Sequence, residues 1–463
     1  MSKAVFLFLK LIIIGGLAVV ILIALYLVDN VISDRQSYRD QAVESISQSY
    51  ATEQRILGPV LVQPYRETTP VETLTDKGVK KIEMHTVEST YTIFPGTLSV
   101  KGVMKPSIRR HGLYRVPVYE FQGSLSGHFD VPQPAIKGDV QFGVPYLAFT
   151  VRDARGIVGT PVMRLNGESY VVQGAGSTAL EQDNPVHPDL AWSTNLRALL
   201  PAMAGKPGAF DFNLDLTLAG TEKLELVPVA TSNHFELSSP WAEPLFAGQF
   251  LPHTREITPE GFHAIWEISS LASATQHQMN TGEKEIDEVN VSLVDPIDPY
   301  RLSDRAVKYG ILFVLLTFGG FFLFEIIKRM LIHPVQYLLV GFCLAVFFLL
   351  LVSFSEHIAF GLAYLIATAA CVGLLTYYLV FVLKSTTYGL AFGAILTTLY
   401  AAIYGLLVSE DNALLLGSLL LFGLLALVMI ATRKIDWYQR TSDLTQSTSS
   451  PVTPAASQMR VDD

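Results

Sequence analysis

The sequence predicts an integral membrane protein, in which a bundle of six transmembrane α-helices is joined to a large, mainly β domain resembling an antiparallel β-sandwich. Half of the 463 residues are hydrophobic and only 16% are charged, against about 25% charged in an ordinary soluble protein. Six apolar stretches approach or exceed the length that crosses a hydrocarbon core of about 30 Å. Between the first and second stretches, apolar and polar residues alternate, which is typical of strands with one face in water.

The first apolar stretch covers about residues 5–28 and is interrupted only by Lys10. A cleaved signal peptide usually has a shorter apolar core, of about 7–15 residues, and a cleavage site made of small residues. This stretch is longer and ends as Ala24-Leu-Tyr-Leu-Val-Asp29, without such a site. We therefore expect residues 1–28 to form an uncleaved signal anchor, and a cleaved signal peptide is the alternative.

The other five stretches lie close together at about 307–327, 335–354, 359–383, 387–408 and 413–432. Lys or Arg follows the second, fourth and sixth stretches, whereas the loops at 355–357 and 409–412 contain neither. Because basic loops stay in the cytoplasm, we predict that both termini are cytoplasmic and that 307–432 is a five-helix transmembrane bundle. The tail 433–463 is rich in Ser and Thr, so we expect it to be cytoplasmic and largely disordered.

Residues 29–306 are predicted to form an extracytoplasmic domain, with a stalk helix up to about Tyr50 and strands after it. The run from Phe210 to Leu218 alternates apolar residues with polar ones, as a half-buried strand does. No repeat decides between one β module and two. Most of the acidic excess of the chain falls in this region, which disfavours tight contact with anionic lipid.

Composition also limits partners and cofactors. The net charge of −9 argues against a nucleic-acid partner, whereas the apolar stretches make the lipid bilayer a partner. Oligomeric state is not predicted. The two cysteines, Cys343 and Cys371, exclude a disulfide scaffold, and we expect neither a cysteine pair nor a cysteine-rich metal site.

No catalytic or metal-binding motif stands out in the sequence. Asp211-x-Asn213-x-Asp215 begins like a calcium loop, but Leu216 occupies the position that needs glycine. The Gly123–Gly127 segment has Leu125 where a nucleophile elbow needs serine. We therefore expect no catalytic residues, no metal, no cofactor and no enzymatic activity.

Ionisable residues near the predicted membrane surfaces are the first candidates for function, because burying a charge without a partner is costly. At the outer face the opposed charges are interpreted either as a ring that docks the domain to the bundle, with Arg305 facing Glu356, or as a set of solvated residues at headgroup level. The second interpretation is favoured. At the inner face, Glu325 is predicted to pair with Lys328, three residues later. The outer candidates are Arg301, Arg305, Lys308, Glu356, His357, Glu410 and Asp411.

Two short motifs call for a structural explanation. Asp153-Ala-Arg155-Gly156 follows a strand-like run. It is either an anion site or an Asp–Arg pair that shapes a turn, and the second interpretation is favoured. Gly389-x-x-x-Gly393, on the fifth predicted span, allows two helices to approach closely.

Segments spread in order along nearly the whole chain match a known family. They are 56–61, 153–157, 248–252 with 255–256 and 261–262, 302–309, 333–341, 355–357, 413–417 and 432–438. Through them the chain resembles the CreD family of bacterial inner-membrane proteins, and the resemblance is weakest over 71–131. It implies the topology described above with the outer domain in the periplasm, and a protein of the periplasm or envelope as a partner. It also implies an association with a two-component regulon and envelope phenotypes such as colicin tolerance and response to cell-wall-active antibiotics, and it brings no catalytic residues.

Three hypotheses follow from the sequence. The leading one is a non-enzymatic inner-membrane protein that contributes to cell envelope integrity and uses its β domain to contact an envelope component. The rival is an enzyme or lipid-handling protein at the periplasmic face of the bilayer, in which Glu356 and His357 perform acid–base chemistry. A signalling partner of a sensor kinase is the third, and it depends on the resemblance alone.

Overall fold

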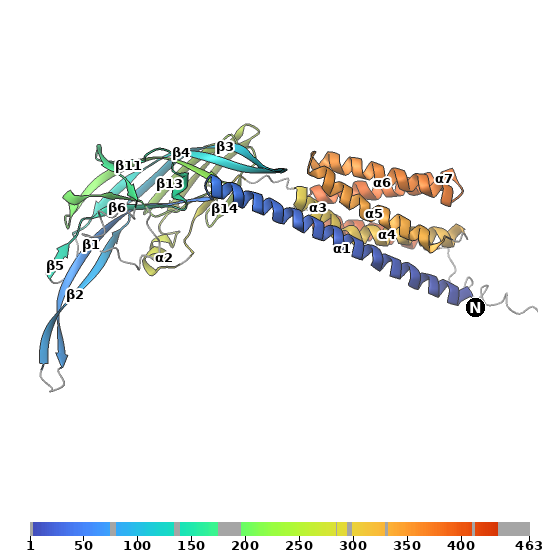
Figure 1. Cartoon of the computed structure of the whole chain (residues 1–463), viewed down its shortest axis with the longest axis horizontal. Coiled ribbons are helices and arrows are strands. Elements are labelled where there is room, and N and C mark those ends of the chain that lie inside the picture. The colour runs from blue at the N-terminus through green and yellow to red at the C-terminus, as the bar shows by residue number, and fades with distance from the viewer. Residues whose placement is uncertain are drawn as a thin grey trace, which may run out of the picture. The chain divides into compact units, whose positions relative to one another are not determined.

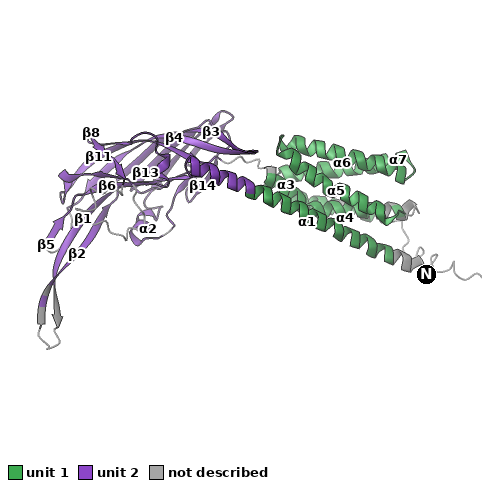
Figure 2. Ribbon diagram, viewed as in Figure 1, with its two compact units in different colours: residues 1–37, 297–463 green, residues 38–296 purple. Residues whose placement is uncertain are grey.

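The computed structural model divides the chain into two compact units (Figure 2). It describes residues 3–74, 80–133, 139–174, 196–283, 285–293, 299–328, 332–409 and 413–433. The first unit comprises Met1–Ser37 and Ile297–Asp463, and the second comprises Tyr38–Pro296. We call them the helical unit and the β unit, and we describe each by itself.

Helices occupy all six apolar stretches. They are α1 (Lys3–Ser49), α4 (Gly310–Lys328), α5 (Pro334–Ser355), α6 (Phe360–Val382), α7 (Thr386–Val408) and α8 (Ala413–Thr432). A short helix, α3 (Pro299–Lys308), precedes α4 at a bend of 40°. Among the described residues, four helices are long and apolar enough to cross a membrane, and α3 with α4 makes a fifth if the bent pair is one span. The membrane helices are thus confirmed, and a sixth span at α8 stays a prediction.

The α1 helix continues without a break from the first apolar stretch through the segment for which a stalk helix was predicted (Figure 1). Within the helical unit, α1 packs closely on α5, because a Cβ added at Gly341 would overlap the side chain of Ile21. Gly310, at the start of α4, is similarly close to Leu25, with a Cβ lying 2.8 Å from the leucine Cδ1. The apolar part of α1 is therefore an integral member of this unit.

Glycines bring α6 and α7 together, as the Gly389-x-x-x-Gly393 pattern predicts. A Cβ at Gly389 would lie 2.5 Å from Cγ2 of Val380, and one at Gly393 would overlap the hydroxyl of Thr376. Both contacted residues belong to α6. The close approach of two helices is thus confirmed.

The two cysteines lie side by side, contrary to the expectation that the chain holds no cysteine pair. Cys343 on α5 and Cys371 on α6 are free thiols whose Sγ atoms are 3.3 Å apart. The hydroxyl of Tyr400 lies 3.3 Å from the Cys371 sulfur. A separation of 28 residues gives no hint of this pairing, which arises only because α5 and α6 pack antiparallel across a short connection.

The β unit contains two sheets within its described ranges. The nine-stranded sheet has the order β14-β17-β12-β1-β6-β10-β9, and β2 and β5 pair with β1. Its strands are β1 (Gln54–Leu74), β2 (Lys80–Ile93), β5 (Asp139–Phe142), β6 (Tyr146–Val151), β9 (Gln173–Gly174), β10 (Leu196–Leu199), β12 (Lys223–Leu226), β14 (Leu245–Gly248) and β17 (Val289–Ser292).

The eight-stranded sheet has the order β15-β16-β13-β3-β4-β11-β7-β8. Its strands are β3 (Thr97–His111), β4 (Tyr114–Val131), β7 (Val162–Leu165), β8 (Glu168–Val171), β11 (Gly208–Thr221), β13 (Ser232–Ser239), β15 (Thr254–Thr258) and β16 (Gly261–Ser269). The 3₁₀ turns η1 (Ala154–Gly156) and η2 (Pro201–Met203) and the helix α2 (Thr275–Thr281) lie in the connections.

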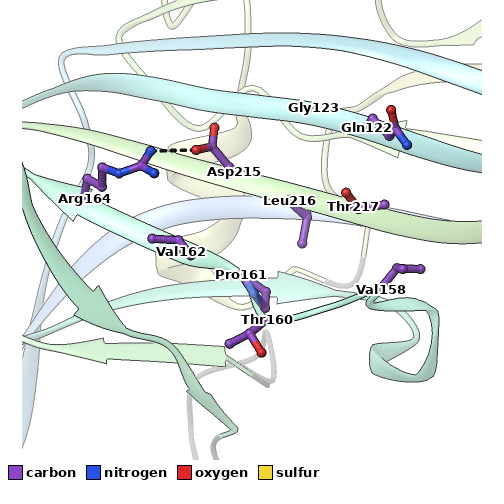
Figure 3. Close-up of a pocket in the computed structure, with 10 residues that line it drawn as sticks. All are labelled: Gln122, Gly123, Val158, Thr160, Pro161, Val162, Arg164, Asp215, Leu216 and Thr217. Carbon is purple, nitrogen blue, oxygen red and sulfur yellow. Dashed lines mark hydrogen bonds and ion pairs between the residues drawn. The ribbon is translucent and has the colours of Figure 1, made fainter.

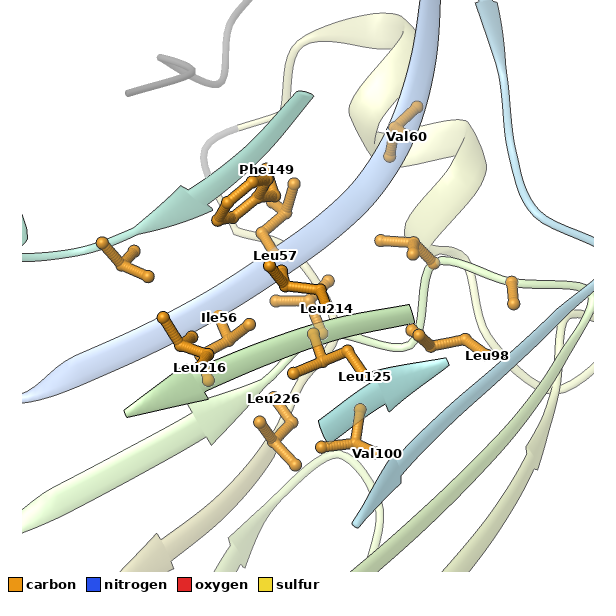
Figure 4. Close-up of a cluster of buried hydrophobic side chains, with 14 of the residues drawn as sticks. Ile56, Leu57, Val60, Leu98, Val100, Leu125, Phe149, Leu214, Leu216 and Leu226 are labelled. Atoms are coloured by element: carbon orange, nitrogen blue, oxygen red, sulfur yellow. The ribbon is translucent and has the colours of Figure 1, made fainter. Parts of the chain in front are cut away.

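One hydrophobic cluster joins the two sheets (Figure 4). Ile56 and Leu57 of β1 belong to it together with Val100 of β3 and Leu214 of β11, and all four side chains are at most 3% exposed. The alternation along 210–218 is confirmed, because the apolar positions of β11 are buried and the intervening ones are exposed or half-buried. Since the two sheets share this core, the β unit is a single module.

The expectation of an antiparallel domain is correct for most strand pairs and wrong for two. β1 pairs with β12 in parallel, and β13 pairs with β3 in parallel. A parallel pair needs a long crossover between its strands, and here more than 100 residues separate each pair. The alternating pattern identifies strands but carries no information about such distant partners.

The α6–α7 contact predicts the effect of a larger side chain at Gly393. Gly393→Leu must force the two helices apart, because the added carbon atoms occupy the position of Thr376, and overpacking of this kind typically costs about 1–3 kcal/mol. Thermal unfolding of the purified full chain in detergent should therefore occur several degrees lower. Gly405→Leu on the same helix is the matched control, since nothing lies within 4 Å of a Cβ there; equal losses in both variants would contradict this account.

Candidate functional site

The predicted ring of charges is described at Arg301, Arg305, Lys308, Glu356 and His357, whereas Glu410 and Asp411 lie outside the described residues. Glu356, directly after α5, is the acid of this set that the structure describes, and its side chain is 8% exposed. Its carboxylate lies 3.4 Å from Nε of Arg35 on α1 and accepts a hydrogen bond of 3.3 Å from the hydroxyl of Tyr300 on α3.

These contacts differ from the expected pairing of Glu356 with Arg305. Arg35 was not selected from the sequence, because it lies more than 300 residues from Glu356 in a segment expected to be a solvated stalk. The side chain of His357 is exposed, and Lys308 pairs with Asp304 of its own helix at 2.6 Å. Through these two contacts, Glu356 connects α1 and α3 to the end of α5 within the helical unit.

A second buried charge pair lies at the other end of this unit. Lys10 of α1 forms an ion pair with Glu325 of α4, and both side chains are 8% exposed. Lys10 also donates to the carbonyl of Ile332 at 2.9 Å, and the hydroxyl of Tyr337 donates to Glu325 at 3.1 Å. The predicted pairing of Glu325 with Lys328 stays a prediction, because the side chain of Lys328 lies outside the described residues. The sequence reasoning missed Lys10, which it treated only as an interruption of the first span.

In the β unit, the Asp153-Ala-Arg155-Gly156 motif forms η1 and its N-cap. The Asp153 carboxylate accepts from the backbone and the guanidinium of Arg155 and from the backbone N–H of Thr52 at 3.0 Å. Arg155 also donates to the carbonyl of Gln48, near the end of α1, at 2.7 Å. These donors, with Arg155 the strongest, hold the pKa of Asp153 at about 2. The pair shapes a turn, as the favoured interpretation predicted.

Gly156 is needed at this turn because the chain passes close to two other segments. A Cβ on Gly156 would overlap the carbonyl of Ala219 on β11 and the side-chain amide of Gln54 on β1. That amide is fully buried and donates to the carbonyls of Asp153 and Ala219 at 3.0 and 2.9 Å. The motif thus fixes the end of α1, β1 and β11 to one another inside the β unit.

Sequence reasoning missed a buried cluster of ion pairs around Glu225 on β12, whose side chain is 2% exposed. Lys223 lies 2.6 Å from its carboxylate, Arg55 of the neighbouring parallel strand lies 3.4 Å away, and Arg152 is also paired with it. The alternation of Lys223-Leu-Glu225-Leu indicated a strand with a wet face. The sequence thus indicated the strand, but its polar face is covered by Arg55 of β1 and by Arg152, the residue after β6.

The outer face of the eight-stranded sheet carries the main hollows of the β unit. Gly102 and Gly123 are directly paired across β3 and β4, and the ring of Phe121 fills the core side of both. On the opposite, outer side, two hollows of about 470 and 430 Å³ adjoin one another. They share Gln122, Gly123 and Asp215, so we call them together the sheet groove.

Charged side chains of both signs line the sheet groove. In one hollow, Arg164 donates to Asp215 at 2.7 Å (Figure 3). In the other, Lys101 and His263 lie 2.9 and 3.1 Å from the carboxylate of Glu236. Lys101, followed by His263, holds the pKa of Glu236 at about 2, so that carboxylate stays ionised.

These side chains suit a polar ligand that offers both hydrogen-bond donors and acceptors, because they present ionised groups of each sign along one exposed strand face. Among the described residues, no group of three or more His, Cys, Asp or Glu could hold a metal ion. The sheet groove is the candidate functional site of the β unit, and it was not selected from the sequence.

Comparison with known proteins bears on the whole chain. The family model described as "Inner membrane protein CreD" matches residues 6–438. The chain is also 33% identical over 440 residues to the inner membrane protein CreD of Escherichia coli strain K12, covering 93% of this chain and 94% of that protein. The chain belongs to the CreD family. The resemblance noted in the sequence is thereby confirmed, and with it an inner-membrane location.

Likeness to solved structures is weak. A variant of the M1 zinc metallopeptidase from Deinococcus radiodurans aligns with a TM-score of 0.22 and 9% identity, over 43% of this chain and 42% of that chain. The unmodified enzyme aligns with a TM-score of 0.21 and 7% identity over the same shares. Scores this low carry no argument about the fold or the activity of this CreD-family chain.

The turn at Gly156 gives a prediction for the β unit. Gly156→Ala places a methyl group against a backbone carbonyl and a buried amide, and strain of this kind typically costs about 1–3 kcal/mol. The full chain should unfold at a lower denaturant concentration, as followed by the loss of β-sheet circular dichroism. Gly208→Ala at the start of β11 is the matched control, because nothing lies within 4 Å of a Cβ there; an unchanged Gly156→Ala variant would contradict the proposed close packing.

Proposed function

We propose that this CreD-family chain is a non-enzymatic inner-membrane protein that contributes to cell envelope integrity by binding a polar envelope component in the sheet groove. The observation that carries the proposal is the contrast between the two sets of charged groups. The sheet groove presents ionised side chains on an exposed face, whereas Glu356, the acid of the rival site, is buried in contacts with Arg35 and Tyr300. The groove has charge available for a ligand.

The proposed topology places the β unit in the periplasm, α8 as a sixth span and both termini in the cytoplasm. Its support is the alternation of basic and non-basic loops along the sequence. We also propose that α1 is retained as an uncleaved signal anchor. The support is the Lys10–Glu325 pair, because cleavage after the first span would leave Glu325 buried without its cation, and an unpaired buried charge is strongly destabilising.

The α1 proposal predicts a specific pattern of stability. Lys10→Gln should destabilise the helical unit by roughly 3–5 kcal/mol, because it removes one partner of a buried pair. Adding Glu325→Gln should restore part of that loss, since the remaining groups are then neutral. Thermal unfolding of the purified variants measures both effects. N-terminal sequencing of the purified wild type should give residues that precede Val5, and a mature chain that begins beyond Tyr26 would reject the signal anchor.

The physiological part of the proposal is a role in the response of the envelope to stress and to cell-wall-active antibiotics, within a two-component regulon. Its support is the family resemblance alone. A non-enzymatic role fits a site whose paired charges are arranged along a strand face, with no described group of residues suited to hold a metal ion. The partner we propose is a component of the periplasm or of the cell envelope, and a protein is one such component.

The sheet groove proposal is tested by removing its charges. Asp215→Asn with Glu236→Gln should abolish the ability of the chain to restore antibiotic tolerance to a strain that lacks it, because each change releases a paired cation and alters the charge offered to a ligand. Protein abundance should stay at the wild-type level, as measured by immunoblot. Glu260→Gln with Glu283→Gln, two exposed acids elsewhere in the β unit, is the matched control.

Crosslinking in living cells identifies what occupies the groove. A photo-reactive residue at Val103, which is exposed and lines one hollow, should yield a discrete product, whereas one at Leu271, exposed but outside the groove, should not. Full tolerance in the groove variant would reject the proposal. Loss of tolerance in His357→Ala and in Glu356→Ala, at normal abundance and with the groove variant active, would instead favour the rival at the membrane face.

A further inference from the structure

The hairpin formed by β3 and β4 extends beyond the strands that pair with it on either side, and its end has an unusual charge. The pairing of β3 with β13 ends at Val103, and that of β4 with β11 ends at Val118. Among the described strands, residues 108–117 therefore pair only with each other. No Asp or Glu occurs from Ser89 to Tyr119, although the chain as a whole is acidic.

Two arginines face each other across this ribbon. Arg110 and Arg115 are direct cross-strand partners, and both are exposed. Like charges at directly opposed positions destabilise a strand pair, and neither guanidinium forms an ion pair with any described residue. Arg109, in contrast, lies over the ring of Tyr50 at 5.5 Å. The opposed pair is thus arranged at a cost to the ribbon, which an anion bound between the two guanidinium groups would offset.

Apolar side chains accompany the arginines at the tip. Ile108 and Leu113 are 48% and 58% exposed. Ile108 continues the row of alternate positions that is buried at Leu98, Val100 and Met104, so the apolar face of β3 extends beyond its cover. We call Ile108, Arg110, Leu113 and Arg115 the basic tip.

We propose that the basic tip binds the anionic headgroups of phospholipids. Guanidinium groups bind phosphate oxygens through paired hydrogen bonds, and exposed aliphatic side chains beside basic residues are typical of segments that enter a membrane interface. The chain also supplies the surface, since the β unit is joined at both of its ends to a unit of membrane helices. The β unit is consequently tethered to a bilayer.

The acidic balance of the β unit does not oppose this contact. Salt screens charges that are more than about 8 Å apart at physiological ionic strength, so distant acids of the β unit contribute little at the tip. The nearest acid that follows along the strand is Glu120, which lies opposite Lys105 and thus beyond the end of the tip. The expectation that this region avoids tight contact with anionic lipid concerns its average charge and stays a prediction, and the proposal applies to the basic tip alone.

Binding to a second membrane tests the proposal with the full chain. The chain is placed in nanodiscs of phosphatidylcholine and mixed with vesicles of phosphatidylcholine that contain or lack phosphatidylglycerol. It should float only with the anionic vesicles, and added salt should weaken this binding. Arg110→Gln with Arg115→Gln should weaken it roughly 25-fold, because each basic residue near an anionic surface contributes about fivefold. Leu113→Ser should weaken it without a change in charge.

Two controls separate this role from general charge and from folding. Lys206→Gln with Arg255→Gln removes the same charge at exposed positions elsewhere in the β unit and should leave binding unchanged. The double arginine variant should unfold at the same temperature as wild type or at a higher one, since it relieves repulsion within the ribbon.

Four results would overturn the proposal. They are equal flotation with neutral and anionic vesicles, equal losses in the control and arginine variants, a lowered unfolding temperature in the arginine variant, and displacement by inorganic phosphate combined with an unaffected Leu113→Ser. The last result would identify an anion site that does not depend on a lipid surface.

Discussion

Several charges removed from water in this protein are held by opposite charges that come mainly from distant parts of the chain. The desolvation cost of a buried ion is several kcal/mol unless a partner and further hydrogen bonds compensate it. Lys10 and Glu325 satisfy this requirement between α1 and α4, and Glu225 does so with cations from β1, β12 and the residue after β6. Because each pair is lost if one segment moves away, these contacts define which segments must stay together within each unit.

The need of a buried charge for a partner also distinguishes charges that stabilise the fold from charges that can bind a ligand. The carboxylate of Asp153 accepts hydrogen bonds from the backbone of Thr52 and from Arg155. That of Glu356 pairs with Arg35 and accepts a hydrogen bond from Tyr300. Both acids were selected from the sequence, and in the structure both connect segments that lie apart in the chain. Exposed charge is found instead along the sheet groove and at the basic tip. Two chemically different surfaces of one β unit are thus open to ligands, one with mixed charge and one with positive charge.

Glycines allow segments of this protein to pack closely at several positions, and only some of these contacts could be predicted from the sequence. The spacing of Gly389 and Gly393 predicted a contact between two helices, because small residues four positions apart lie on one face of a helix. Gly102 and Gly123 gave no such signal, although their pairing across β3 and β4 positions Phe121 in the core and leaves the outer face hollowed. Their meaning depends on strand register, which a single sequence does not report.

What the sequence determined by itself was local: the apolar stretches that became α1 and α4–α8, the alternation that became β11, and the turn at Asp153. These features follow from hydrophobic period and from contacts between near neighbours, which the order of residues records directly. The family also follows from residue order. Only the tertiary structure decided the parallel partners of β1 and β3, the neighbouring thiols of Cys343 and Cys371, and the cations that neutralise Glu325, Glu356 and Glu225. Each of these depends on packing between segments far apart in the chain, because nothing in the local pattern at one segment specifies the residue that will neutralise or contact it from another.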